Sequence, residues 1–88
     1  MNKQTKPQLS VYYRAGCHLC EQLIAELSQL QQALQETIDF DFELIDIDQD
    51  AALRKRYDVD VPVVALNDEV LCYHFFDADT VRQALNHG

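Results

Sequence analysis

The chain has 88 residues, 48% of them hydrophobic, and its 15 acidic and 7 basic residues give a formal net charge of −8. This length suits a single domain with one core, and the composition is that of a globular protein rather than a disordered one. Because a negative surface repels phosphate groups, we expect neither nucleic-acid binding nor membrane association.

The start of the chain and the cysteine count indicate a compartment. Residues 1–8 are polar and no apolar segment typical of a secretion signal follows them, so we expect a flexible lead-in there. Three cysteines are too few for the disulfide framework of a small secreted domain. We therefore expect one domain over residues 1–88, a reducing cytoplasmic location and a monomer.

The first half of the chain predicts a strand, a long helix and a second strand. Residues 9–13 are rich in β-branched and aromatic side chains, which favours a strand. Residues 17–35 have the leucine spacing of one helical face, and the members of that stripe are Leu23, Leu27, Leu30 and Leu34. Residues 40–47 alternate acidic and apolar side chains, which predicts a strand with its acids outward.

The second half predicts a short helix, a hairpin and a last helix. Aspartates at 48–50 can cap a helix over residues 51–57, with Leu53 and Tyr57 facing inward. Residues 63–66 and 70–75 predict two antiparallel strands joined by Asn67-Asp68, and a helix follows Asp77 or Asp79. The expected fold class is α/β, a four-stranded mixed sheet in the order βαβαββα with helices on both faces. The first two strands should be parallel neighbours.

Cys17-His18-Leu19-Cys20 lies where the first strand gives way to the long helix. The unpaired N–H groups and positive dipole end of a helix start favour a thiolate over a thiol. Cys20 is three residues further along, on nearly the same helical face, so it can reach back to Cys17. This geometry predicts a pair of thiols that makes and breaks one disulfide.

The CxxC pair, the element order, Val61-Pro62 before the third strand and the hairpin after it occur together across residues 9–87. In this combination the chain resembles the thioredoxin-like superfamily, and within it the small glutaredoxin-like proteins. The resemblance implies that Cys17 attacks and Cys20 resolves, and that the Val61–Pro62 bond is cis and faces the disulfide. Val61 would then offer a free backbone N–H and C=O to an extended substrate.

Glutaredoxins also carry a basic residue three positions before the attacking cysteine, a place that Arg14 takes here. The resemblance implies that Arg14 stabilises the thiolate and meets a substrate carboxylate. His18, next to Cys17, is a second candidate for lowering the pKa of that thiol when its imidazole is charged. The site predicted by resemblance thus comprises Cys17 and Cys20 as catalytic residues, Arg14, Val61 and Pro62 as substrate-binding residues, and no metal.

Two stretches depart from the glutaredoxin pattern. His18-Leu19 stands where Pro-Tyr is usual, and an aromatic stretch at 73–76 stands where glutaredoxins have a glycine pair. Bulky side chains there oppose the close approach of the glutathione backbone. We therefore expect no bound cofactor and a disulfide-bearing protein or small thiol as partner, with glutathione left open as an electron donor.

Several alternatives stay open at this point. Tyr12, Tyr13, Phe75 and Phe76 flank the expected active-site end of the sheet, where core packing is their expected role and Tyr13 or Phe76 could line a substrate groove. Cys72 is expected to be an inert strand thiol, with a regulatory disulfide as its alternative. The chain could be a non-catalytic binding module, or a zinc or iron–sulfur protein. Further metal ligands are scattered singly, at His18, Cys72, His74 and His87.

Overall fold

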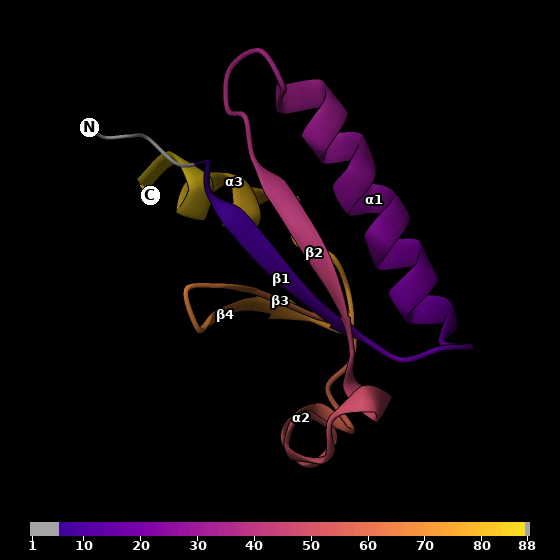
Figure 1. Ribbon diagram of the computed structural model, residues 1–88. Helices are drawn as coiled ribbons and strands as arrows, with labels where there is room; N and C mark the ends of the chain where they lie inside the picture. Colours follow the sequence, from indigo (N-terminus) through magenta and orange to yellow (C-terminus); the bar gives the residue numbers. More distant parts are fainter. Residues whose placement is uncertain (1–5, 88) are drawn as a thin grey trace.

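The computed structural model describes residues 6–87. Its elements follow the expected order, with one additional turn of 3-10 helix before α2 (Figure 1). They are β1 (Gln8–Tyr13), α1 (His18–Leu34), β2 (Asp41–Asp46), η1 (Ile47–Gln49), α2 (Ala51–Tyr57), β3 (Val63–Leu66), β4 (Glu69–Tyr73) and α3 (Ala78–His87). The α/β class predicted from the sequence is confirmed.

The four strands form one mixed sheet in the spatial order β2-β1-β3-β4. β1 and β2 are parallel, as a strand–helix–strand crossover requires, while β3 is antiparallel to both β1 and β4. The β3–β4 hairpin closes through Asn67 and Asp68, whose φ angles of 51° and 71° are both left-handed. A two-residue hairpin turn of this hand matches the twist of the strands it joins, and Asn and Asp tolerate it.

Helices cover both faces of the sheet (Figure 1). On one face, α1 and α3 bury their apolar side chains against β1 and β3 in a cluster that includes Leu27, Val11, Val64 and Val81. On the other face, Ile47 and Tyr57 pack with Val63 beneath α2. Residues alternate between the faces along each strand, which is why the neighbours Val63 and Val64 belong to different clusters. The larger cluster anchors the helix that carries the cysteines.

Three expectations differ from the structure at strand ends and edges. β1 begins at Gln8, and the Pro7 carbonyl accepts a hydrogen bond from Asp41 N–H at 3.0 Å, so the lead-in is shorter than predicted. Of the expected lead-in, residues 1–5 lie outside the described residues. β4 ends at Tyr73 rather than Phe75. Leu44, expected to face inward, is 48% exposed and lies on β2, an edge strand of the sheet.

Candidate active site

Cys17 is the residue that begins the long helix. Its backbone is extended, with φ −95° and ψ 113°, and its carbonyl already accepts the first helical hydrogen bond, from Glu21 N–H at 3.0 Å. Its Sγ accepts a hydrogen bond from Cys20 N–H at 3.1 Å. The sulfur therefore takes the place of the side-chain oxygen of an ordinary N-cap and satisfies one of the orphan donors. The predicted placement of Cys17 at the helix start is confirmed.

The two thiols of the pair differ in exposure. Cys17 is partly exposed, whereas Cys20 is only 1% exposed and sits under the first turn of α1. Burial raises the pKa of Cys20 to about 12, and the hydrogen bond and charge of the neighbouring Cys17 sulfur act in the same direction. The backbone N–H of Arg14 opposes the rise by hydrogen bonding to the Cys20 sulfur. At neutral pH the inner sulfur is thus a thiol, and the outer one is the accessible nucleophile.

Arg14 does not point at Cys17 as the resemblance implied. Its guanidinium binds Asp48 through Nε and Nη2, at 3.0 to 3.3 Å, and Asp58 through Nη2 at 2.8 Å. Hydrogen bonding to Asp48 is the main cause that raises the pKa of Arg14. Two carboxylates thus pair with the positive charge of Arg14 in this conformation, and its expected role in stabilising the Cys17 thiolate stays a prediction.

The Arg14 cluster instead ties the β1–α1 loop to η1 and to the end of α2. We expect Arg14→Ala to lower the midpoint of urea unfolding, with a smaller effect in a background that carries Asp48→Asn and Asp58→Asn. In that background both carboxylate partners of Arg14 are already gone, so removing the guanidinium breaks no ion pair. Arg54→Ala, at an exposed position of α2, is the matched control. Equal shifts in both backgrounds would show that the cluster contributes nothing.

Val61 and Pro62 lie before β3, and the peptide bond between them is cis. The Val61 N–H, expected to be free for a substrate, donates to the Tyr57 carbonyl at 3.1 Å. Asp60 N–H donates to the same carbonyl at 2.9 Å. The carbonyls of the last turn of a helix lack intrahelical donors, and the chain after α2 supplies them here. The expected pairing of a substrate with the Val61 N–H is therefore wrong for this state.

His74 is a structural residue that the sequence reasoning missed. It has a left-handed backbone, with φ 66°, where such a conformation is rare for a residue other than glycine. Its N–H donates to the Pro62 carbonyl at 2.8 Å, and its Nε2 donates to the Val59 carbonyl at 2.8 Å, since a carbonyl only accepts. A histidine alone is too weak a signal to predict this conformation from the sequence. His74 is the first residue of the loop that follows β4.

The four aromatic residues near this end of the sheet have different roles. Tyr12 stacks on Tyr57, with ring centroids 4.4 Å apart, and packs in the smaller core cluster as expected. Phe76 contacts the larger cluster and also lines a cavity of about 120 Å³ between α1 and the β4–α3 loop. Phe75 lines the same cavity but is 68% exposed, so its expected core role is wrong. Tyr13, at the end of β1, is partly exposed.

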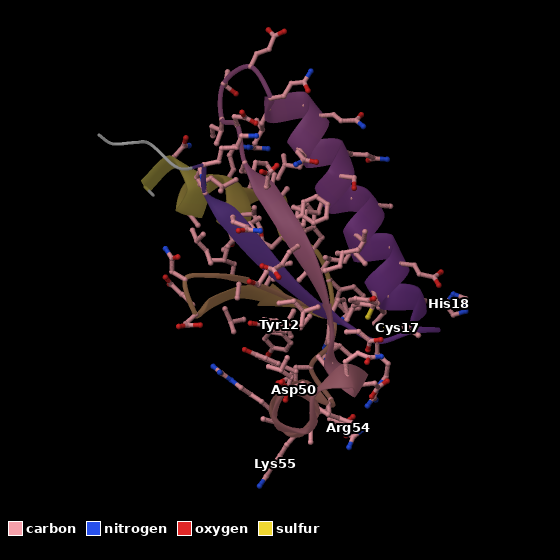
Figure 2. All side chains as sticks on the ribbon, in the orientation of Figure 1. Tyr12, Cys17, His18, Asp50, Arg54 and Lys55 are labelled. Atoms are coloured by element: carbon pink, nitrogen blue, oxygen red, sulfur yellow. The ribbon has the colours of Figure 1, made fainter. Side chains whose placement is uncertain are left out.

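The remaining candidate residues lie apart from the thiol pair or face solvent. His18 is exposed and points away from the sheet beside Cys17 (Figure 2). Cys72 lies opposite Val64 in the hairpin and packs against the larger cluster, and burial raises the pKa of its thiol. Within residues 6–87, no three His, Cys, Asp or Glu side chains gather as metal ligands would. In the same range, every helix is too short or too polar to cross a bilayer.

Comparisons with known proteins place this geometry in a family. A family model described as "Glutaredoxin-like domain (DUF836)" matches residues 8–86. The solution structure of protein Ne2328 from Nitrosomonas europaea is similar, with a TM-score of 0.73 and 40% identity over 96% of this chain and 98% of that one. A protein from X. campestris aligns with a TM-score of 0.63 and 32% identity, over 91% of this chain and 97% of that one.

Thioredoxin-2 of a malaria parasite shares the fold at 16% identity, with a TM-score of 0.65 over 99% of this chain and 87% of that one. A comparison with curated proteins finds no match. The superfamily resemblance expected from the cysteine pair and the element order is confirmed. The family model spans nearly all of the described residues, and the Nitrosomonas protein aligns over almost its full length. The chain therefore belongs to the glutaredoxin-like domain family and has the thioredoxin-like fold.

Proposed function

We propose that this protein is a thiol–disulfide oxidoreductase in which Cys17 attacks and Cys20 resolves. The asymmetry of the two thiols supports the proposal most directly. One sulfur is partly exposed at a helix N-terminus and accepts a backbone N–H, while the other is buried within the same turn and held as a thiol. An attacking and a resolving sulfur need this difference in access, because only the outer one has to meet a substrate.

The reaction moves two electrons between sulfurs and needs no bound cofactor. The Cys17 thiolate attacks one sulfur of a substrate disulfide, so that its S–S bond breaks and the first substrate thiolate leaves. Cys20 then loses its proton to solvent and attacks the Cys17 sulfur. This step forms the Cys17–Cys20 disulfide and releases the second substrate thiolate. In the reverse direction, the Cys17–Cys20 disulfide is reduced and a substrate dithiol is oxidised through the same mixed disulfide.

The Cys20 N–H has a specific role in this sequence. It lies 3.1 Å from the Cys17 sulfur and donates to it, so it stabilises negative charge there before the attack. When Cys17 leaves as a thiolate in the reverse reaction, the same N–H stabilises the negative charge that returns to the Cys17 sulfur. A backbone donor fixed by the helix requires no reorganisation at either moment.

Trapping of the mixed disulfide tests the proposal. We expect a Cys20→Ser variant to form a stable covalent adduct with a peptide disulfide, because no second thiol is placed to release Cys17. The adduct is measured by mass spectrometry under non-reducing conditions and should disappear with added dithiothreitol. In the wild-type protein the same mixture should yield free peptide thiol and the internal disulfide.

Cys72→Ser is the matched control, since it removes a thiol of the same chain that lies on β4 and outside the pair. That variant should behave as the wild type does. If Cys20→Ser forms no adduct while its Cys17 still reacts with iodoacetamide, the exchange function is wrong and a binding module is the better description. Release of a metal ion on acidification of the purified protein would instead favour the metal-binding alternative.

A further inference from the structure

Two adjoining hollows share the β4–α3 loop as a wall, and the first of them lies between that loop and α1. The first has a volume of about 120 Å³, and Leu19, one of the two residues between the cysteines, forms part of its wall. The second, shallower hollow has a volume of about 510 Å³ and continues along the start of α3. Phe75 and Phe76 line both, so the two hollows form one groove, called here the aromatic groove.

Internal hydrogen bonds fix the β4–α3 loop, which forms a wall of the aromatic groove. His74 ties the loop to the chain before β3 through its N–H and its Nε2, both at 2.8 Å. Asp77 accepts from the N–H and the hydroxyl of Thr80 at 3.1 and 2.8 Å, which fixes the start of α3. A preformed wall costs less ordering entropy when a ligand binds.

The groove presents exposed apolar side chains to solvent. Leu19 is 36% exposed, Tyr73 55% and Phe75 68%. Leu19 lines the first hollow, Tyr73 lines the second and Phe75 lines both, whereas the buried Leu23 and the partly buried Phe76 contribute less exposed surface. Such a surface suits an apolar or aliphatic side chain of a ligand.

The charge of the aromatic groove is negative. Glu26 lines the first hollow, and Asp77 and Asp79 line the second, whereas none of the described residues in either wall is Lys or Arg. Arg82 reaches Asp79 at 3.4 Å and Thr80 donates to both Asp77 oxygens, so Glu26 is the carboxylate best placed to act on a ligand. The hydrogen bonds from Thr80 hold the pKa of Asp77 below its usual range, so this carboxylate stays ionised.

We infer that the aromatic groove binds the segment beside the reacting cysteine of a polypeptide disulfide, and prefers a segment with apolar and basic side chains. A lysine or arginine can lay its methylene stem on Leu19 and Phe75 and place its charge near Glu26. The inference rests on the proposed exchange at Cys17. It makes a cationic polypeptide, rather than a small anionic thiol, the substrate class.

Glutathione fits the same groove poorly on electrostatic grounds. It carries two carboxylates and one ammonium group, so its net charge has the same sign as the charges of Glu26, Asp77 and Asp79 in the groove walls. The cation nearest in sequence to the pair, Arg14, is already bound by Asp48 and Asp58. Charge complementarity therefore favours the basic polypeptide and disfavours the tripeptide.

The test compares three disulfides as substrates of the reduced wild-type protein. Two are symmetric disulfides of acetyl-Arg-Cys-Phe-amide and acetyl-Glu-Cys-Phe-amide, and the third is oxidised glutathione. Each second-order rate constant is divided by that of dithiothreitol with the same disulfide, which removes differences in intrinsic reactivity. We expect a normalised preference of about tenfold for the arginine peptide over the other two, because steering by opposite charge acts on association. In about 0.5 M salt the preference should shrink severalfold.

Variants localise the effect to the groove. Glu26→Gln and Phe75→Ala should each lower the preference, whereas Glu36→Gln removes the same charge in the exposed turn beyond the far end of α1 and should leave it intact. Equal normalised rates for the three disulfides, or a preference that survives in both groove variants, would overturn this inference alone. Failure of the protein to reduce any of the three would overturn the proposed function as well.

Discussion

In a Cys17→Ser variant, the rate of disulfide exchange is expected to fall by at least about 10³-fold. The reason is that this variant lacks the one sulfur of the pair that is accessible to a substrate. A serine hydroxyl does not ionise at neutral pH and is a far weaker nucleophile than a thiolate. The buried Cys20 does not replace it, because that sulfur is 1% exposed and its pKa is about 12. Turnover of a peptide disulfide, followed by release of free thiol, measures the loss.

The same variant should keep its fold, which separates chemistry from stability. Serine is among the best N-cap residues, and its Oγ can accept the Cys20 N–H that Cys17 Sγ now accepts. The urea midpoint of Cys17→Ser should therefore stay close to that of the wild type. Cys72→Ser is the control that removes one thiol elsewhere and should retain turnover. Substantial turnover by a folded Cys17→Ser protein would rule out Cys17 as the nucleophile.

Features set by neighbouring residues were predictable from the sequence. The leucine stripe located α1, and the CxxC at its start put Cys17 at the N-cap. Asn67-Asp68 marked the hairpin, because few other residue pairs adopt two left-handed conformations in succession. In each case the controlling interaction spans four residues or fewer along the chain. Such interactions act on any segment with that pattern, so periodicity and turn chemistry were sufficient.

Contacts between distant segments were not predictable in the same way. Arg14 pairs with Asp48, 34 positions away, and nothing local distinguishes that carboxylate from the many others in this acidic chain. The Val61 N–H donates to the Tyr57 carbonyl because α2 ends at Tyr57, whose carbonyl has no donor within the helix. Family likeness suggested the residues of the site but not the partners that they have in the structure. The free Val61 N–H that it implied is wrong in this structure, because that N–H donates to the Tyr57 carbonyl.

Exposure along the edges was also decided by tertiary structure. The alternation in residues 40–47 predicts one apolar face, yet Leu44 stays half exposed on β2, an edge strand of the sheet. Phe75 is also exposed, in the loop that follows the end of β4 and the left-handed His74. Neither exposure follows from the local sequence pattern. Phe75 is nevertheless the residue that gives the aromatic groove its exposed apolar rim.

The release step is expected to accelerate with pH by close to tenfold per unit between about pH 6 and 8, because the attacking group is the Cys20 thiolate. Burial is the largest cause of the raised pKa of Cys20 and persists in the mixed disulfide. The contributions from Cys17 vanish there, since a sulfur in a disulfide carries no charge. The pKa should then lie lower than about 12 but still above the ordinary thiol range, so the thiolate remains a minor species that grows with pH.

Single-turnover kinetics measure this dependence without interference from the first step. Cys17 is converted to a mixed disulfide with a chromophoric aromatic thiol in a Cys72→Ser background, and absorbance follows the release of that thiol after a jump to each pH. The Cys20→Ser protein, treated identically, should release none on this timescale. A rate that levels off below pH 7 would mean that Cys20 is ionised there, and burial would then have failed to hold it as a thiol. A rate that rises through pH 8 identifies proton loss from the buried Cys20 sulfur as the step that ends each turnover. The packing over Cys20 then helps to determine how long a substrate stays bound to Cys17 as a mixed disulfide.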